Sequence, residues 1–140
     1  MEELSKIRQK ISSFNKNRTL LLANIMKTEP FIAAQVYERF KKCGNKNCKC
    51  SRGELHGPFT WLYQNKKGQK LISTTVKKEI APEALKYAEN YKLLLEQRKQ
   101  VREIDEQINL LITQIEVILE RDASIYVTKE KAIKGRSEEN

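Results

Sequence analysis

The chain has 140 residues, of which 39% are apolar, 7% aromatic and 32% charged, and its formal net charge is +9. This composition is too polar for a large globular core and too apolar for a disordered chain, so it favours one small unit built on amphipathic helices. No apolar run is long enough to span a membrane, and the start MEELSKIRQK is not a secretory signal, so we expect a cytoplasmic protein.

The positive charge is unevenly spread along the chain. Residues 43–80 carry eight basic and two acidic side chains, whereas residues 81–140 carry ten basic and twelve acidic ones. A basic half joined to a nearly neutral half is typical of a head that binds a polyanion and a stem that supports it.

The chain begins with a helical pattern. Apolar residues lie three and four positions apart in this stretch: Leu4, Ile7, Ile11 and Phe14. Their spacing predicts a helix over about residues 2–14. A polar break and a second apolar patch, NKNRTLLLANIM, follow before Pro30 interrupts the chain. We expect residues 1–30 to form an N-terminal helical segment.

Residues 31–80 are predicted to form a small β module. The segment FIAAQVYERFKK, residues 31–42, fits a helix or a strand, and we favour a strand because the segment enters a cysteine-rich turn. In FTWLYQNKKGQKLISTTV, two β-branched and aromatic runs flank a polar turn, which indicates a β-hairpin. Phe59, Trp61 and Tyr63 share one face of its first strand.

We expect one long helix over residues 81–122, because the run from Pro82 to about Arg121 contains no further Pro and no Gly. Seven apolar residues form a heptad-like stripe along it: Leu94, Val101, Ile104, Ile108, Leu111, Ile115 and Ile118. Four more widen the stripe beyond a two-stranded seam: Leu110, Ile112, Val117 and Leu119. The stripe could pack on the N-terminal helix, or it could bind a second copy or a partner helix. Residues 123–140 are expected to form a flexible tail.

The predicted fold class is therefore α+β. A short antiparallel sheet, stabilised by zinc, is expected between an N-terminal helix and a long, coiled-coil-like C-terminal helix.

All three cysteines and the only histidine lie within fourteen positions. Four soft or borderline ligands this close together indicate a structural zinc site: Cys43, Cys48, Cys50 and His56. Metal-free burial of the thiols is disfavoured by the charged residues among them, and a redox pair would lack the surrounding βαβ pattern. Catalytic zinc is disfavoured too, because no carboxylate stands in an HExxH-like context.

Basic residues surround the cysteine cluster and occupy the hairpin turn: Lys41, Lys42, Lys46, Lys49, Arg52, Lys66, Lys67 and Lys70. Such a cluster neutralises phosphates, and Trp61 and Tyr63 could stack on unpaired bases, so a nucleic-acid-binding module is predicted. Alternatively, the lysines form an ordinary solvated surface and the aromatic rings pack as core against the long helix.

A second hypothesis makes the long helix the functional part of the chain. The protein would then be an adaptor or interaction subunit whose helix binds a homodimer partner or another protein, with zinc purely structural. An enzyme is the least supported class, because the sequence has no glycine-rich phosphate loop and its only histidine is assigned to the metal.

The stretch RFKKCGNKNCKCSRGELHGPFTWLYQNKKGQKLISTTV, followed by YAENYKLLLEQ, resembles a family of small, functionally uncharacterised bacterial and archaeal proteins. Their pattern is similar to RCGxxxCxCxxGxxHGPY, then an aromatic hairpin that ends in GK and a helix with a tyrosine-rich start. Lys42, Phe59 and the GQK sequence depart from that pattern, and none of them is a ligand. The resemblance implies the metal site, framed by Gly44, Gly57 and Pro58, and it implies no activity.

Overall fold

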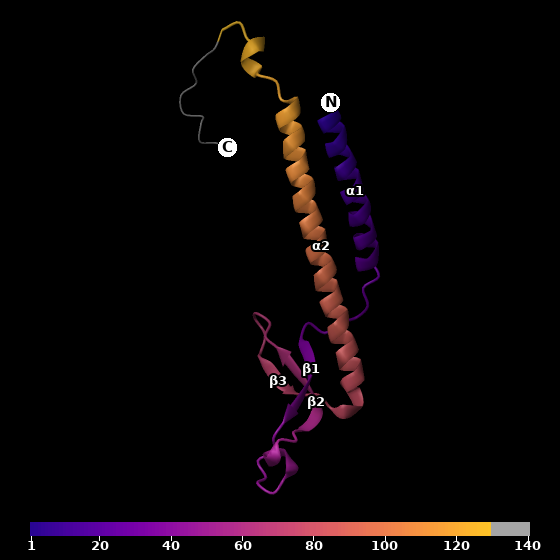
Figure 1. Ribbon diagram of the computed structural model, residues 1–140, viewed down its shortest axis with the longest axis vertical. Coiled ribbons are helices and arrows are strands. Elements are labelled where there is room, and N and C mark those ends of the chain that lie inside the picture. The colour runs from indigo at the N-terminus through magenta and orange to yellow at the C-terminus, as the bar shows by residue number, and fades with distance from the viewer. Residues whose placement is uncertain (130–140) are drawn as a thin grey trace.

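The computed structural model describes residues 1–129, apart from the side chains of Cys50 and Ser51. Its elements are α1 (Glu2–Ile25), β1 (Gln35–Lys41), η1 (Lys49–Arg52), β2 (His56–Gln64), β3 (Ile72–Thr75), η2 (Lys78–Ile80), α2 (Ala81–Leu119) and η3 (Ala123–Tyr126). Helices α1 and α2 lie side by side as an antiparallel stem, and the sheet lies at the end where α2 begins (Figure 1). The predicted α+β class is confirmed.

One continuous helix, α1, replaces the shorter helix and break predicted at the N-terminus. The less exposed positions keep a spacing of three or four residues through the polar stretch: Ile7, Ile11, Phe14, Arg18, Leu21 and Ile25. Arg18 takes the place of an apolar residue, and its Nε donates a hydrogen bond to Oδ1 of Asp105 in α2 at 2.7 Å. The predicted end at residue 14 is therefore wrong, because a polar contact continues the amphipathic face.

The buried core of the stem is small. Leu4 and Ile7 of α1 and Leu111 of α2 are buried, and Leu4 is only 2% exposed. All seven residues of the predicted stripe are buried or half-buried, and α1 packs along α2. The stripe therefore faces the N-terminal helix of the same chain. The residues that widen the stripe stay outside this contact, and Val117 is 72% exposed.

Residues 26–34 connect α1 to β1 and are held against α2. Nδ2 of Asn90 donates a hydrogen bond to the carbonyl oxygen of Pro30 at 2.9 Å. The rings of Phe31 and Tyr91 stack with their centroids 5.2 Å apart. These contacts fix the point at which the chain leaves the stem and enters the sheet.

The sheet has three antiparallel strands in the order β1-β2-β3. The sequence favours a strand for residues 31–42, and residues 35–41 of that segment form β1. The predicted hairpin is formed by β2 and β3. The central strand β2 pairs Trp61 with Tyr37 on one side and with Thr75 on the other. Side chains of β2 are therefore flanked by residues of both edge strands.

The long helix is confirmed as α2, with Pro82 in its first turn, where a missing backbone N–H costs no hydrogen bond. Within the predicted tail, residues 123–126 form the 3₁₀ turn η3. The rest of that prediction, residues 130–140, lies outside the described residues. Among the helices that the structure describes, none combines the length and apolar character needed to cross a bilayer.

Candidate metal centre

The candidate ligands come from the loop between β1 and β2 and from the start of β2. Cys43 follows β1 by two positions, and His56 begins β2 opposite Lys41 of β1. Cys48 immediately precedes η1. Because β1 and β2 are hydrogen-bonded neighbours, their adjoining ends bring Cys43 and His56 together across a separation of 13 positions.

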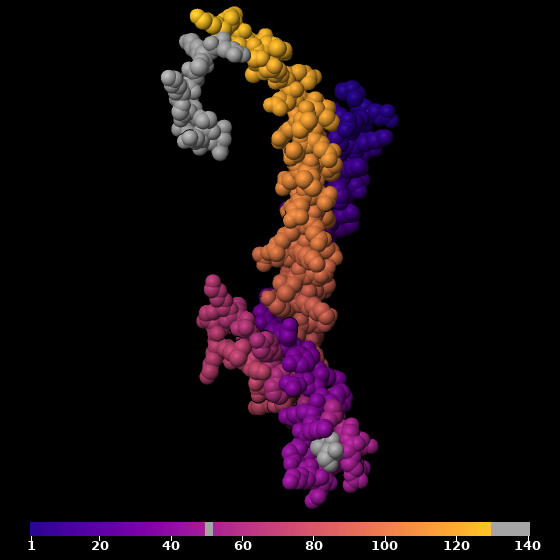
Figure 2. Space-filling view, turned by 60° about the vertical axis from the view of Figure 1, so that its left-hand side comes forward, coloured from indigo at the N-terminus to yellow at the C-terminus, as the bar shows by residue number. Residues whose placement is uncertain are grey.

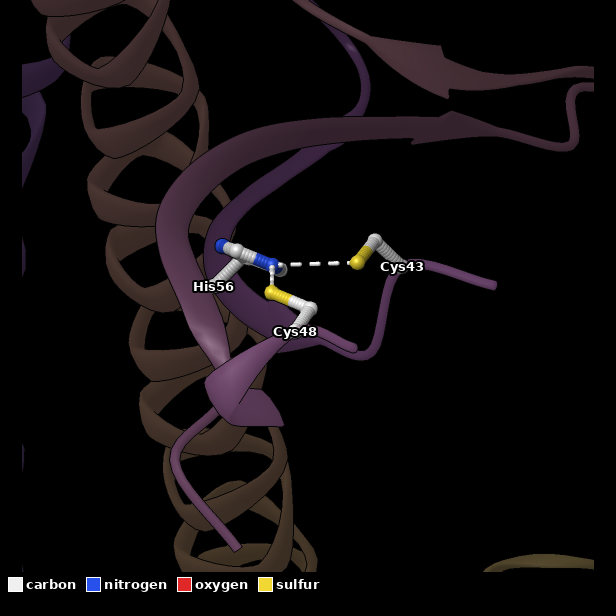
Figure 3. A group of neighbouring side chains, drawn as sticks. All are labelled: Cys43, Cys48 and His56. Carbon is white, nitrogen blue, oxygen red and sulfur yellow. Dashed lines mark hydrogen bonds between the residues drawn. The ribbon is translucent and has the colours of Figure 1, made fainter. Parts of the chain in front are cut away.

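The two thiols and the imidazole face one another (Figure 3). Nε2 of His56 lies 2.8 Å from Sγ of Cys48 and 3.2 Å from Sγ of Cys43. All three donor atoms lie within 4.8 Å of one another. In a tetrahedral zinc site a sulfur and a nitrogen ligand are about 3.6 Å apart, so the thiols would need to move outward by less than about 1 Å. Two sulfurs and one imidazole nitrogen are ligands that zinc prefers, and the group fits one metal ion.

The fourth predicted ligand is Cys50, whose backbone lies in η1. Its side chain is outside the described residues, so its role stays a prediction. The position is two residues beyond Cys48, in the short turn that follows it. A structural zinc site normally has four protein ligands.

A turn shapes the loop that carries the thiols. Oδ1 of Asn45 accepts a hydrogen bond from the backbone N–H of Asn47 at 3.0 Å. The backbone oxygen of Asn45 accepts one from the N–H of Cys48 at 3.2 Å. Asn favours this conformation because its side chain can replace a backbone acceptor. The chain thus turns back, and Sγ of Cys48 reaches the ring of His56.

Gly57 follows His56 at a position where no other residue fits. Its φ is +140°, which L side chains rarely adopt. A Cβ at this position would lie 2.8 Å from the backbone oxygen of Arg39 and 2.9 Å from Cδ1 of Phe40. Glycine therefore allows β2 to approach β1 closely beside the candidate metal centre.

The predicted basic residues form two groups at opposite ends of β2. The loop group flanks the candidate ligands along the chain: Lys41, Lys42, Lys46, Lys49 and Arg52. The turn group lies between β2 and β3: Lys66, Lys67 and Lys70. All eight are exposed. The nine residues of β2 separate the groups by about 30 Å, so the structure does not gather them into one patch. The loop forms the end of the molecule farthest from the N-terminus (Figure 2).

Cations lie over the aromatic rings of the central strand. Cζ of Arg39 is 4.7 Å from the ring centroid of Trp61, and Nζ of Lys41 is 5.0 Å from that of Phe59. Such distances are typical of cation–π contacts. Nε1 of Trp61 donates a hydrogen bond to Oγ of Ser73 at 3.1 Å, which fixes the orientation of the indole ring.

Tyr63, the third aromatic residue of this strand, has different surroundings. It lines a hollow together with Leu85 and Tyr91 of α2. Tyr63 thus borders the contact between the sheet and the long helix, whereas Trp61 and Phe59 lie beneath exposed cations.

Arg39 is a residue that sequence reasoning missed. In a strand over residues 31–42, alternation puts Tyr37, Arg39 and Lys41 on the face opposite to Val36 and Phe40. That alternation was available in the sequence. The pairing of Arg39 with Phe59 was not, because it depends on the register between β1 and β2.

A family profile described as "Domain of unknown function (DUF6788)" matches residues 2–86. The match covers α1, the sheet, the cysteine-containing loop and the start of α2, which is more than half of the chain. No curated protein and no solved structure matches the chain. The chain belongs to this family of uncharacterised function, DUF6788.

Proposed function

We propose that the protein is a non-enzymatic module that binds nucleic acid, DNA or RNA, through a basic surface held by a structural zinc ion. Cys43, Cys48, Cys50 and His56 would bind the zinc. The observation that carries this proposal is the position of the loop group. Its exposed cations lie next to the candidate ligands in the chain, in the loop where two thiols converge on one imidazole. A metal bound there would fix the loop that carries the charges.

Phosphate neutralisation supplies the binding energy in this proposal. Each cation that contacts a phosphate releases condensed counterions, so the affinity falls as salt rises, with a slope of about 0.9 per contact on logarithmic axes for a duplex. Residues 43–80 contain eight basic and only two acidic side chains, so the segment that carries the loop has a positive net charge. Binding of this kind is largely independent of sequence.

Charge reversal in the loop tests the proposal. The triple variant Lys46→Glu, Lys49→Glu, Arg52→Glu should bind a fluorescein-labelled oligonucleotide at least about tenfold more weakly, with a flatter salt dependence. Fluorescence anisotropy at several salt concentrations measures both effects. The matched control reverses three exposed charges outside the head: Lys10→Glu, Lys16→Glu and Lys27→Glu. An equal loss in the control would show that binding follows net charge and would contradict a site in the head.

Metal removal tests the role of zinc. Native mass spectrometry should find one zinc ion per chain, and a chelator should remove it and weaken binding of the oligonucleotide. Helical circular dichroism should change little, because α1 and α2 contain none of the predicted ligands. A chain that binds equally well after chelation would contradict the structural role proposed for the metal.

A specific observation favours a second function, that of an adaptor subunit. At the C-terminal end of α2, four large apolar side chains are exposed: Leu110, Ile112, Val117 and Leu119. They form two pairs seven positions apart, Leu110 with Val117 and Ile112 with Leu119, on the two sides of the buried stripe. Exposed apolar side chains of this kind are typical of protein contacts. In this function the stem binds a second copy or a partner helix, and the zinc module caps it. Stem association without nucleic-acid binding at low salt would favour this function over the first.

A further inference from the structure

One face of the sheet combines aromatic rings with cations. The register places Tyr37 opposite Trp61 and Arg39 opposite Phe59, and directly paired residues of antiparallel strands project to the same side. Tyr37 is 40% exposed, and Arg39 is exposed as well. Solvent therefore reaches this face at the level of Trp61.

The indole ring on this face is held by a hydrogen bond, and both aromatic rings are covered by long cationic side chains. The hydrogen bond from Trp61 to Ser73 fixes the indole plane. The covering groups are the long side chains of Arg39, over Trp61, and of Lys41, over Phe59 and, at 5.8 Å, over Trp61. These side chains are exposed, so they can move aside or stack on an incoming ring without unfolding the sheet.

An unpaired nucleobase is the ligand whose chemistry matches this face. Its flat π surface stacks on tryptophan, on phenylalanine and on the guanidinium plane of arginine, and the phosphate beside it pairs with a lysine. A double helix does not offer this surface, because its bases are stacked on one another inside the duplex. The charge of the face also matches this ligand, because its two cations attract negatively charged phosphates.

We propose that Arg39, Lys41, Phe59 and Trp61 form a stacking site for an unpaired base of single-stranded nucleic acid. The proposal rests on the proposed function and adds the class of strand that the module selects. The site adjoins the candidate metal centre, because Lys41 pairs with His56 across β1 and β2. From there the site extends along β2 to Trp61, five positions beyond His56, so a bound strand that stacks on the site can continue to the loop group.

The single tryptophan of the chain provides a local probe. Zinc-loaded, full-length protein is titrated with oligothymidylate and, separately, with its duplex with oligoadenylate at the same salt concentration. We expect the single strand to quench Trp61 fluorescence and to bind at least about tenfold more tightly than the duplex, because stacking contributes only with unpaired bases. An oligouridylate titration extends the same test to RNA.

Variants separate stacking from charge. Arg39→Gln and Lys67→Gln each remove one positive charge, one over Trp61 and one in the turn group, which no cation–π contact joins to Trp61. Arg39→Gln should weaken binding of labelled oligothymidylate by about tenfold, and Lys67→Gln by clearly less. Trp61→Leu should resemble Arg39→Gln. Circular dichroism and zinc content show whether each variant is folded. If Trp61→Leu does not fold, the comparison of Arg39→Gln with Lys67→Gln tests the stacking site.

The outcomes distinguish this proposal from the one on which it rests. Equal affinity for single strand and duplex, with unchanged Trp61 emission, overturns the stacking site and leaves the basic module standing. Equal losses in Arg39→Gln and Lys67→Gln do the same. Absence of binding to either nucleic acid at low salt overturns both proposals.

Discussion

Gly57 connects the candidate metal centre to the sheet, because it lies next to His56 and against the backbone of β1. Gly57→Ala would place a methyl group in conflict with Arg39 and Phe40 at a strained φ. We expect it to lower the free energy of unfolding by about 1–3 kcal/mol and to weaken zinc binding by displacing His56. Urea denaturation and competition with a chelator measure the two effects.

Gly44→Ala is the matched control, because no atom lies within 4 Å of a Cβ at that position. Its effect on stability should stay within about 0.5 kcal/mol. Equal losses in the two variants would refute the steric role assigned to Gly57.

The prediction for Cys50 concerns the number of thiolates on the metal. Cys50→Ser should weaken zinc binding as strongly as Cys43→Ser, because either change would leave a structural zinc ion with three protein ligands. With cobalt in place of zinc, the sulfur-to-metal absorption should fall by about one third in each variant if three thiolates bind. Ser51→Ala, which removes no thiol, is the control. Full absorption in Cys50→Ser would exclude Cys50 as a ligand.

At the residue scale, the set of candidate ligands that come together was predictable, and the geometry around them was not. Cys43, Cys48 and His56 were found from residue type and spacing alone, and the structure brings their donor atoms together. The close approach at Gly57 and the position of Arg39 over Trp61 depend on the register of β1 and β2. Register is fixed by tertiary contacts that a single sequence does not reveal.

At the scale of elements, α1 is longer than apolar periodicity predicts because Arg18 occupies a position on its inner face. A helix can continue its amphipathic stripe through a charged residue when a residue of the neighbouring helix accepts a hydrogen bond from that residue, as Asp105 does from Arg18. That partner lies 87 positions away in the sequence, so local periodicity misses it. The strand β1 was ambiguous for a related reason, since a short apolar run fits either period.

The stem depends on a few buried side chains, which makes it sensitive to their loss. Leu4→Ala should lower the free energy of unfolding by about 2–5 kcal/mol, because a fully buried leucine leaves a cavity. Leu20→Ala lies on the same helix at a position that is 66% exposed, and it should cost about 0.5 kcal/mol or less. Urea denaturation, monitored by circular dichroism, compares the free energies of unfolding of the two variants. Similar losses would mean that α1 does not pack through Leu4.

The whole molecule is extended, and it exposes more surface than a compact monomer. Its accessible surface is 12212 Å², whereas a compact protein of 16.4 kDa exposes about 7,500 Å². A stem of two helices buries only one side of each helix, which explains part of the excess. Apolar side chains at the C-terminal end of α2 are exposed as well, and Leu110 is 58% exposed.

The charges of the stem favour a second copy of the chain at that end. Helix α1 carries five basic and two acidic residues, and α2 carries five basic and seven acidic ones. Two stems packed so that α1 of each lies beside α2 of the other would pair a positive helix with a negative one. The apolar residues that widen the stripe would then be buried in a four-helix arrangement.

Sedimentation of the zinc-loaded protein over a range of concentrations should therefore reveal a dimer. The double variant Leu110→Glu, Val117→Glu should be monomeric with unchanged helix content, because it places two carboxylates in the apolar contact. Asn109→Glu adds a carboxylate at an adjacent, exposed polar position and should leave the dimer intact. A wild-type chain that stays monomeric at every concentration would contradict self-association. The exposed end of α2 would then be left for a different protein, as the adaptor function requires.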